Sequence, residues 1–324
     1  MALLEVRDLE IGISADGGLL PVVQGVSFSV EESETLGIVG ESGCGKSVTA
    51  LAIMGLLEGS VLRVTGGSIR FDGLDLPSLA PAERRAIMGN RMAMIFQEPM
   101  TSLNPVYRVG HQIVEALRQH RTLHLKQARD RAVELLDLVR IPDPAERVDS
   151  YPHQMSGGQR QRVMIAMALA CDPKLLIADE PTTALDVTVQ KDILDLMIDL
   201  QTRTGAAIVL ISHDLGVIAR TCHKVAVMYR GAIVESATTN DLFANMSHPY
   251  TRGLFGSIPP VDRDVEWLGA ITGRVPTIGE ALTGCPFHPR CTLARDLCKS
   301  RAPAPEAVAA AHFVRCHFPQ GVPT

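Results

Sequence analysis

Residues 40–47, Gly-Glu-Ser-Gly-Cys-Gly-Lys-Ser, match the pattern G-x-x-x-x-G-K-[ST] at every specified position. The pattern follows an apolar stretch, Thr35-Leu36-Gly37-Ile38-Val39, and precedes a segment of helical character that starts at Val48. A strand, a Gly-rich turn and a helix in this order are the context in which the pattern forms a phosphate-binding loop. Bare glycine amides and the positive end of the helix attract phosphate oxygens. This feature predicts an α/β core that binds a nucleoside triphosphate.

Each residue of this loop has an expected role. Lys46 is expected to reach the outer phosphates, and the Ser47 hydroxyl is expected to hold Mg²⁺. The remaining members are expected to surround the phosphates with backbone amides; they are Gly40, Glu41, Ser42, Gly43, Cys44 and Gly45. A Gly-rich turn in front of a helix is the alternative without a ligand, and the complete match in its context makes that interpretation the weaker one.

The composition narrows the class of protein. Of the 324 residues 46% are hydrophobic, which is enough for a substantial core and argues against long disorder. The net charge of −5 argues against nucleic acid as a partner, because proteins that bind it broadly carry a basic footprint. The first residues lack the segments of a secretory signal, and no apolar run approaches the roughly 18 residues of a membrane span. We therefore expect any membrane role to come through partner chains.

Apolar runs and turn signals divide the chain into alternating strands and helices. Helical periodicity is expected from Gly110 to about Arg140 and again just after Ser156. Strands are expected at 3–6, 26–30, 35–39, 68–71, 175–178 and 207–211, with a helix over 187–200 between the last two. Continuous apolar strands that alternate with helices predict a parallel sheet covered on both faces.

The same survey predicts two domains. Residues 1–245 are expected to form the nucleotide-binding domain, with a helical subdomain inserted at about 98–160. Residues 246–324 are richer in proline, glycine and cysteine, and we expect them to form a separate C-terminal module.

Two further segments carry side chains suited to phosphate chemistry. The apolar strand before Asp179 ends in two carboxylates: Asp179 is placed to hold Mg²⁺, and Glu180 lies past the strand end, where a carboxylate can polarise an attacking water. Ser156 is a good N-cap residue, and Gly157 and Gly158 leave bare amides that an anion can approach closely. Taken singly, each segment has a plain alternative, a solvated acidic loop for the first and helix capping for the second.

The order of these motifs resembles the ATP-binding subunits of ABC transporters. In that family residues 40–47 correspond to the Walker A loop, Ser156-Gly157-Gly158-Gln159 to the signature motif, and Asp179 and Glu180 to the Walker B aspartate and the catalytic glutamate. Three more residues match within their surroundings: Gln97 in Ile95-Phe96-Gln97-Glu98-Pro99 as the Q-loop glutamine, Asp186 in Ala184-Leu185-Asp186 as the D-loop, and His213 in Ile211-Ser212-His213-Asp214 as the switch histidine.

The resemblance implies a fold and an assembly. The fold is an ABC-type P-loop NTPase of the α/β class, with a RecA-like core, an antiparallel β subdomain and an inserted helical subdomain, followed by a small cysteine-containing C-terminal module. Two such chains, identical or paralogous, are expected to pair head to tail with ATP and Mg²⁺ between them. The signature residues of one chain would then complete the phosphate site of the other, while Gln97 senses Mg²⁺ and water and His213 contacts the γ-phosphate.

Several segments resemble the oligopeptide/dipeptide importer branch of that family; they are 36–43, 96–105, 179–190 and 248–254. This resemblance implies an ATPase that powers peptide import with two transmembrane permease subunits and, indirectly, an extracytoplasmic solute-binding protein. Such a subunit works at the cytoplasmic face of the inner or plasma membrane. Relatives that import nickel, glutathione or another small solute keep the cargo open, and a soluble non-transport ABC ATPase is the alternative from another class.

Two details of the resemblance concern contacts rather than catalysis. In that family the segment after Gln97 meets the coupling helices of the membrane subunits, so residues 98–112 are the candidates here. The family usually has an aromatic residue near position 13 that stacks on adenine, and this chain has Ile13. We expect a weaker grip on the base.

Four of the seven cysteines lie in the last forty residues, at Cys285, Cys291, Cys298 and Cys316. Their spacing, C-x5-C-x6-C-x17-C, is wider than the C-x2-4-C pairs of zinc sites. Without an export signal a reducing compartment is expected, and disulfides are not. Four thiolates suit an iron–sulfur cluster, and the resemblance implies a 4Fe–4S cluster here. Four reduced cysteines, or zinc with His288, His312 or His317 as a substitute ligand, stay open.

Overall fold

A computed structural model describes residues 2–15, 18–97, 102–182, 186–256 and 271–321. The chain forms two compact units, each assembled from segments far apart in the sequence. The first unit consists of residues 1–4, 30–35 and 71–211, and the second of residues 5–29, 36–70 and 212–324. The residues predicted to bind the nucleotide or to act in catalysis are therefore divided between the two units. The first unit contains Gln97, Ser156, Asp179, Glu180 and Asp186, and the second contains residues 40–47 and His213.

The first unit is built on three parallel strands, β6 (Met92–Ile95), β7 (Leu175–Asp179) and β8 (Ala207–Ile211). Every residue of β7 and β8 is buried, as expected for strands covered on both faces. The helix α8 (Val187–Thr204) connects β7 to β8 and buries one face, while α2 (Pro81–Ile87) precedes β6. The short strand β5 (Leu74–Asp75) also belongs to this unit. The sequence prediction of a parallel arrangement is confirmed here.

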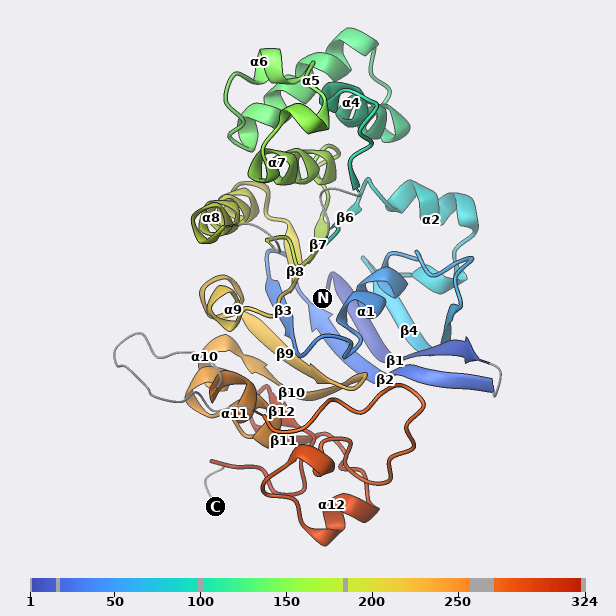
Figure 1. Ribbon diagram of the computed structural model, residues 1–324. Coiled ribbons are helices and arrows are strands. Elements are labelled where there is room, and N and C mark those ends of the chain that lie inside the picture. Colours follow the sequence, from blue (N-terminus) through green and yellow to red (C-terminus); the bar gives the residue numbers. More distant parts are fainter. Residues whose placement is uncertain (1, 16–17, 98–101, 183–185, 257–270, 322–324) are drawn as a thin grey trace. The chain divides into compact units, whose positions relative to one another are not determined.

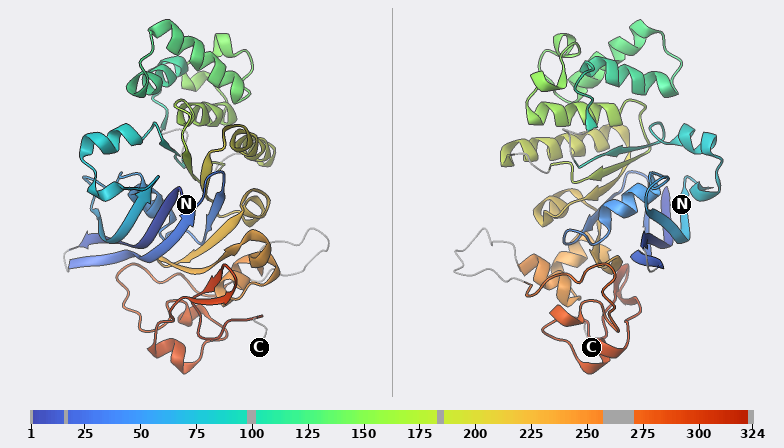
Figure 2. Two further views of the ribbon diagram at one scale, coloured as in Figure 1. Left: turned by 180° about the vertical axis from the view of Figure 1, so that it is seen from behind. Right: turned by 45° about the vertical axis from the view of Figure 1, so that its right-hand side comes forward.

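Four helices form a cluster within the first unit: α4 (Val109–His120), α5 (Leu125–Leu138), α6 (Pro144–Arg147) and α7 (Gly157–Ala168). In Figure 1 these green helices lie side by side, and Figure 2 shows the same grouping from two other sides. Their shared core consists of apolar residues at helical spacing; it includes Ile113, Leu117, Ala128, Ala132, Leu135, Leu136, Val163 and Ile165. Between α5 and α7 the short helix α6 begins at Pro144, because proline suits the first turn of a helix.

The second unit holds two sheets. In one, the long strands β2 (Gly18–Val30), β1 (Leu4–Ala15) and β4 (Leu62–Phe71) are neighbours in that order. In the other, β3 (Thr35–Val39) pairs in parallel with β9 (Lys224–Tyr229), and β9 pairs antiparallel with β10 (Ala232–Thr238). Two helices adjoin these strands, α1 (Lys46–Ile53) after β3 and α9 (Leu215–Thr221) before β9.

The C-terminal segment continues the second sheet. The strand β12 (His312–Val314) pairs antiparallel with β10, and β11 (Glu306–Ala309) pairs with β12, as Figure 2 shows in red and orange. The helices α10 (Thr239–Ala244), α11 (Pro249–Gly256) and α12 (Asp296–Ser300) complete this part of the unit. The domain boundary predicted at 245–246 stays a prediction, and the pairing of β12 with β10 joins its two sides.

Among the residues that the structure describes, no helix combines the length and the apolar character that crossing a bilayer requires.

Candidate nucleotide-binding and catalytic site

The loop between β3 and α1 adopts a conformation that only glycine tolerates at several positions. Gly40, Gly43 and Gly45 have φ angles of 155°, 77° and 106°. At Gly40 an added Cβ would overlap the carbonyl oxygen of Met228, which belongs to β9. The glycines of the motif are therefore required by backbone geometry, as the pattern predicts.

Lys46 and its neighbours make the loop compact. The Lys46 side chain is buried, and its Nζ donates to the carbonyl oxygens of Gly40 at 2.8 Å and Glu41 at 3.1 Å. The Thr49 hydroxyl donates to the carbonyl of Gly45 at 2.9 Å, which closes the first turn of α1. This helix begins at Lys46, two residues earlier than the sequence indicated, because Gly45 in the left-handed region serves as its N-cap. Lys46 and Ser47 thus lie in the first turn, where helix amides point toward an anion.

Cys44 of the loop is a buried thiol rather than a reactive thiolate. Only 1% of its surface is exposed, and burial raises its pKa although Lys46 acts in the opposite direction. Its Sγ lies 3.8 Å from Lys46 Nζ. Desolvation therefore outweighs the nearby ammonium, and the position contributes packing and a backbone amide.

Gln97, Asp179 and Glu180 meet at the ends of β6 and β7. Asp179 is the last residue of β7 and is 4% exposed, and Gln97 follows β6 by two residues. The Gln97 amide donates from Nε2 to Glu180 Oε2 at 3.2 Å. Because β6 and β7 are parallel neighbours, their carboxyl ends share one edge, which brings these side chains together.

Glu180 has an unusual backbone for its residue type. Its φ angle is 47°, in the left-handed region that non-glycine residues seldom occupy, and its N–H donates to the Ile211 carbonyl at 2.9 Å. Such strain costs on the order of 1–3 kcal/mol and is concentrated at functional sites. The conformation supports the role predicted for Glu180.

The Ser156 segment forms a capping box at the start of α7. Ser156 Oγ accepts from the Gln159 amide at 3.3 Å, and Gln159 Oε1 accepts from the Ser156 amide at 3.0 Å. Ser156 and Gly157 are exposed, so the predicted anion would reach this helix start. A Cβ on Gly158 would lie 2.6 Å from Val189 Cγ1, so this glycine also allows α7 to approach α8 closely. Gln159 is engaged by the box itself.

Two more predicted residues lie at helix starts. Asp186 caps α8 by accepting from the Val189 amide at 2.9 Å, whereas Ala184 and Leu185 of the same motif lie outside the described residues. His213 is exposed in a turn between Ser212 and Asp214, and Asp214 caps α9 by accepting from the Gly216 amide at 2.8 Å. The Ser212 amide donates to the Ile38 carbonyl at 3.2 Å. The turn that carries His213 is thus attached to β3, the strand before the phosphate-binding loop.

Two residues in contact with the loop are absent from the sequence prediction. The Arg290 guanidinium binds the Glu41 carboxylate, and the Tyr250 hydroxyl accepts from the Glu41 amide. The only signal for Tyr250 is its place in the segment 248–254, which the family resemblance singles out without assigning a contact. Nothing in the sequence indicates Arg290, which lies 249 positions from Glu41.

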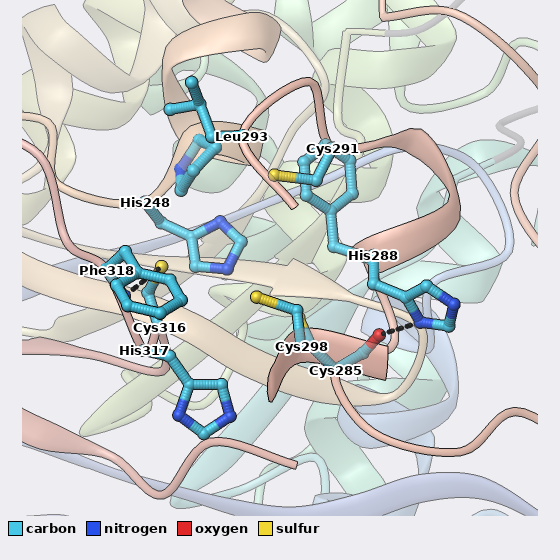
Figure 3. Close-up of a pocket in the computed structure, with 11 residues that line it drawn as sticks. His248, Cys285, His288, Cys291, Leu293, Cys298, Cys316, His317 and Phe318 are labelled. Atoms are coloured by element: carbon cyan, nitrogen blue, oxygen red, sulfur yellow. Dashed lines mark hydrogen bonds between the residues drawn. The ribbon is translucent and has the colours of Figure 1, made fainter. Parts of the chain in front are cut away.

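The four C-terminal cysteines line one small pocket of about 20 Å³. In Figure 3 the sulfur atoms of Cys291, Cys298 and Cys316 face the same space beside the His248 ring. The apolar side chains of Phe287, Leu293 and Phe318 complete the wall, and burial raises the pKa of Cys316 to about 11. Within the described ranges no group of three or more His, Cys, Asp or Glu residues lies at metal-ligand spacing. The thiols converge, but they are not arranged around an ion.

The histidines considered as substitute ligands have other contacts. His312 Nε2 lies 2.8 Å from Glu235 Oε1, and His288 Nδ1 lies 2.9 Å from the Cys285 carbonyl oxygen. His317 lines the pocket, with its Nε2 2.8 Å from the Arg301 carbonyl oxygen. His312 is therefore held away from the pocket by a buried carboxylate, which disfavours zinc binding through this residue.

Comparison with protein families matches two parts of the chain. Residues 23–183 match the ABC transporter family, and residues 234–298 match the family described as the oligopeptide/dipeptide transporter C-terminal region. A probable peptide ABC transporter ATP-binding protein of Sinorhizobium fredii is 51% identical over 97% of this chain and 94% of that protein. This chain belongs to the oligopeptide/dipeptide family of ABC transporter ATP-binding subunits.

Other members of the family are similar over the same length. The dipeptide transport ATP-binding protein DppD of Escherichia coli is 48% identical over 98% of this chain and 97% of that protein. The oligopeptide transport ATP-binding protein AppD of Bacillus subtilis is 49% identical over 97% and 96%. Among solved structures, a dimeric ATP-binding cassette in a post-hydrolysis state with ADP and Pi matches with a TM-score of 0.65 and 26% identity, covering 73% of this chain and 98% of that one.

Proposed function

We propose that this chain hydrolyses ATP to power a peptide-class ABC importer. Its membership of the oligopeptide/dipeptide family supports both the activity and the class of cargo, and a similar cassette has been solved with the hydrolysis products ADP and Pi. The observation that carries the mechanism is the hydrogen bond of 3.2 Å from Gln97 to Glu180, whose backbone is held in a left-handed conformation. A carboxylate held in this way can orient a water molecule for attack on phosphorus.

In this mechanism the chain contributes mainly position and charge. When ATP binds, Lys46 Nζ exchanges its hydrogen bonds with the carbonyl oxygens of Gly40 and Glu41 for contacts with the outer phosphates. The amides of residues 40–47 surround the other phosphate oxygens. Glu180 orients the water, and His213 contacts the γ-phosphate. By the family pattern, Ser47, Asp179 and Gln97 would hold Mg²⁺, and the ion would neutralise phosphate charge. These residue roles follow the family pattern and the local geometry of each segment.

We propose a head-to-tail pair of ATP-binding subunits as the active form. The solved cassette that this chain resembles is a dimer. The exposed capping box at Ser156 fits a role in trans, because the start of α7 presents amides to an anion supplied by another chain. Asp186 caps α8, whose Val189 lies beside Gly158 of α7, and it would adjoin the partner.

The membrane partners are proposed to be two permease subunits, with a solute-binding protein on the far side of the membrane. This places the chain at the cytoplasmic face of the membrane. A candidate contact lies in the part of 98–112 that is described, where Val106 is 73% exposed and Tyr107 47% exposed. The Gln112 side chain stabilises this loop through three hydrogen bonds. It accepts from the Asn104 amide at 2.9 Å and donates to the carbonyl oxygens of Asn104 and Tyr107. A rigid loop with exposed apolar side chains suits docking.

The test uses the chain co-expressed with candidate permease subunits. Glu180→Gln should lower ATP hydrolysis at least 100-fold while ATP binding is retained, because the substitution removes the carboxylate and keeps the shape. The matched control is Glu32→Gln in an exposed turn, which should leave hydrolysis unchanged. Undiminished hydrolysis in Glu180→Gln would overturn the mechanism, and failure to co-purify with any permease would favour a soluble ATPase.

A second proposal concerns the cysteine pocket: we propose that the four thiols hold an iron–sulfur cluster. Four cysteine side chains on an apolar-walled pocket are the donor set such clusters use. A bound cluster would supply a cross-link between residues 285 and 316. Anaerobically purified protein should be brown and contain iron and sulfide, both lost in Cys291→Ser. Colourless, iron-free protein that remains folded would leave four reduced cysteines as the correct description.

A further inference from the structure

The second residue of the phosphate-binding loop, Glu41, is held at three of its groups. Its carboxylate receives the Arg290 guanidinium at 2.6 and 2.9 Å, and its amide donates to the Tyr250 hydroxyl at 2.9 Å. Its carbonyl oxygen accepts from Lys46 Nζ at 3.1 Å. Glu41 therefore connects the C-terminal segment directly to the lysine expected to contact phosphate.

Arg290 is fixed by more than this ion pair. Its side chain is 4% exposed, its Nε donates to the Thr272 carbonyl at 3.1 Å, and its guanidinium lies 5.9 Å from the centre of the Tyr229 ring. A buried guanidinium that binds a carboxylate through two parallel hydrogen bonds has a defined direction as well as a charge. Removing the Glu41 carboxylate would leave the buried guanidinium without a compensating charge.

Tyr250 is fixed in a comparable way. It is fully buried, and its ring packs on Tyr229 and Phe287 with centroid distances of 4.7 and 5.4 Å. Its amide donates to His248 Nδ1 at 3.0 Å, and the His248 amide donates to the buried Glu235. The hydroxyl that meets Glu41 thus stands at the end of a rigid series of buried groups.

We propose that Arg290 and Tyr250 are positioning residues for the phosphate-binding loop, so that the C-terminal segment sets the affinity of this chain for ATP. The loop carries three glycines with positive φ, and a free loop of this kind would have to be ordered when ATP binds. Fixing it in advance reduces that cost and strengthens binding. The inference rests on the proposed binding of ATP at residues 40–47.

The location of Arg290 and Phe287 also links the phosphate-binding loop to the cysteine pocket. Cys291 follows Arg290 directly, and Phe287, which packs on Tyr250, lies on the wall of the cysteine pocket. Both positioning residues are thus held by the segment that carries the thiols. A change in this segment that moves Arg290 or Phe287 is transmitted to Glu41 without any contact with the nucleotide.

The experiment measures ATP affinity by isothermal titration calorimetry on the full chain with Mg²⁺, in the Glu180→Gln background so that ATP is not consumed. Arg290→Met should weaken ATP binding about tenfold, and Tyr250→Phe should weaken it about fivefold. Arg290→Lys keeps the positive charge but loses the two parallel hydrogen bonds of the guanidinium, so its ATP affinity should lie between that of Arg290→Met and that of the parent. In a double-mutant cycle, Glu41→Gln combined with Arg290→Met should weaken binding no further than Arg290→Met alone. The matched control is Arg274→Met, which removes an exposed ion pair with Glu280 in the same segment.

A second measurement separates positioning from folding. Hydrogen exchange of the peptide containing residues 40–47 should accelerate in Tyr250→Phe, while peptides from β9 and β10 keep their protection. If the parent chain binds ATP and both Arg290→Met and Tyr250→Phe bind it within twofold, the positioning role is wrong. An equal loss in Arg274→Met would also overturn it. A parent chain that fails to bind ATP would instead refute the proposed function.

Discussion

At the scale of single residues, backbone conformation decides which side chains the nucleotide loop accepts. Gly40 combines a φ of 155° with a carbonyl oxygen of Met228 in the place where a Cβ would stand. Gly40→Ala should therefore displace the loop, lower the free energy of unfolding by about 1–3 kcal/mol and reduce ATP affinity more than tenfold. Chemical denaturation and calorimetric titration measure both effects.

The control for this prediction is Gly59→Ala. Gly59 has a φ of 81° with no atom within 4 Å of an added Cβ, so the substitution imposes the left-handed penalty without the overlap. It lies outside residues 40–47 and should leave ATP affinity unchanged. Equal losses of affinity in Gly40→Ala and Gly59→Ala would contradict the explanation by overlap.

Burial also determines the chemistry of Cys222, at the C-terminal end of α9. Its surface is 8% exposed, and desolvation raises its pKa to about 12. The thiolate is the nucleophile, so below pH 10 almost no reactive form is present. In the folded chain Cys222 should resist iodoacetamide between pH 7 and pH 10, as peptide mass spectrometry would detect. Alkylation whose rate levels off between pH 9 and pH 10 without unfolding, as for a thiol with the ordinary pKa of 9.0, would refute this value.

At the scale of elements, the start of α7 combines a structural role with a proposed catalytic one. Ser156 caps the helix and is also the residue proposed to face the γ-phosphate of a partner chain. Aspartate caps as well as serine does, and its charge suits a helix N-terminus. Ser156→Asp should therefore keep the free energy of unfolding within about 0.5 kcal/mol of the parent. Hydrolysis should fall at least tenfold, because a carboxylate would oppose the phosphate.

Ser156→Ala separates helix capping from phosphate contact by removing the hydroxyl without adding a charge. Losing the cap should cost about 1 kcal/mol of stability, measured by chemical denaturation. The loss of hydrolysis should be smaller than in Ser156→Asp, since no negative charge is introduced. If Ser156→Asp hydrolyses ATP as the parent does, the start of α7 has no contact with phosphate.

At the scale of the whole molecule, a buried carboxylate joins the C-terminal strands to the rest of their unit. Glu235 of β10 is fully buried and accepts from the amides of Ser247 at 2.6 Å and His248 at 2.9 Å, with His312 Nε2 2.8 Å away. Removing one partner of a buried ionisable pair typically costs about 3–5 kcal/mol. His312→Ala should therefore lower the free energy of unfolding by about 3 kcal/mol in urea denaturation.

The control lies on the same strand. Phe313 is 47% exposed, so Phe313→Ala removes a larger side chain from β12 without touching Glu235. It should cost less than His312→Ala. The reverse order would mean that β12 is held by surface packing and backbone pairing alone.

The sequence determined much of the nucleotide-binding chemistry and of the secondary structure around it. Continuous apolar runs predicted β3, β7 and β8, because strands buried on both faces contain little else. The glycines of the loop and the cap at Ser156 could be predicted since they satisfy local backbone requirements. The family resemblance, which the comparisons confirm, rests on the order of these local motifs.

Tertiary structure alone decided which distant groups touch. The pairing of β12 with β10, the contact of Glu235 with His312 and the ion pair between Glu41 and Arg290 join residues separated by 77 to 249 positions. A single charged residue in a loop carries no periodicity and no local backbone signature, so its partner becomes visible only when the chain has folded. The phosphate-binding loop could thus be predicted from eight consecutive residues, whereas the side chains that hold Glu41 in place could not.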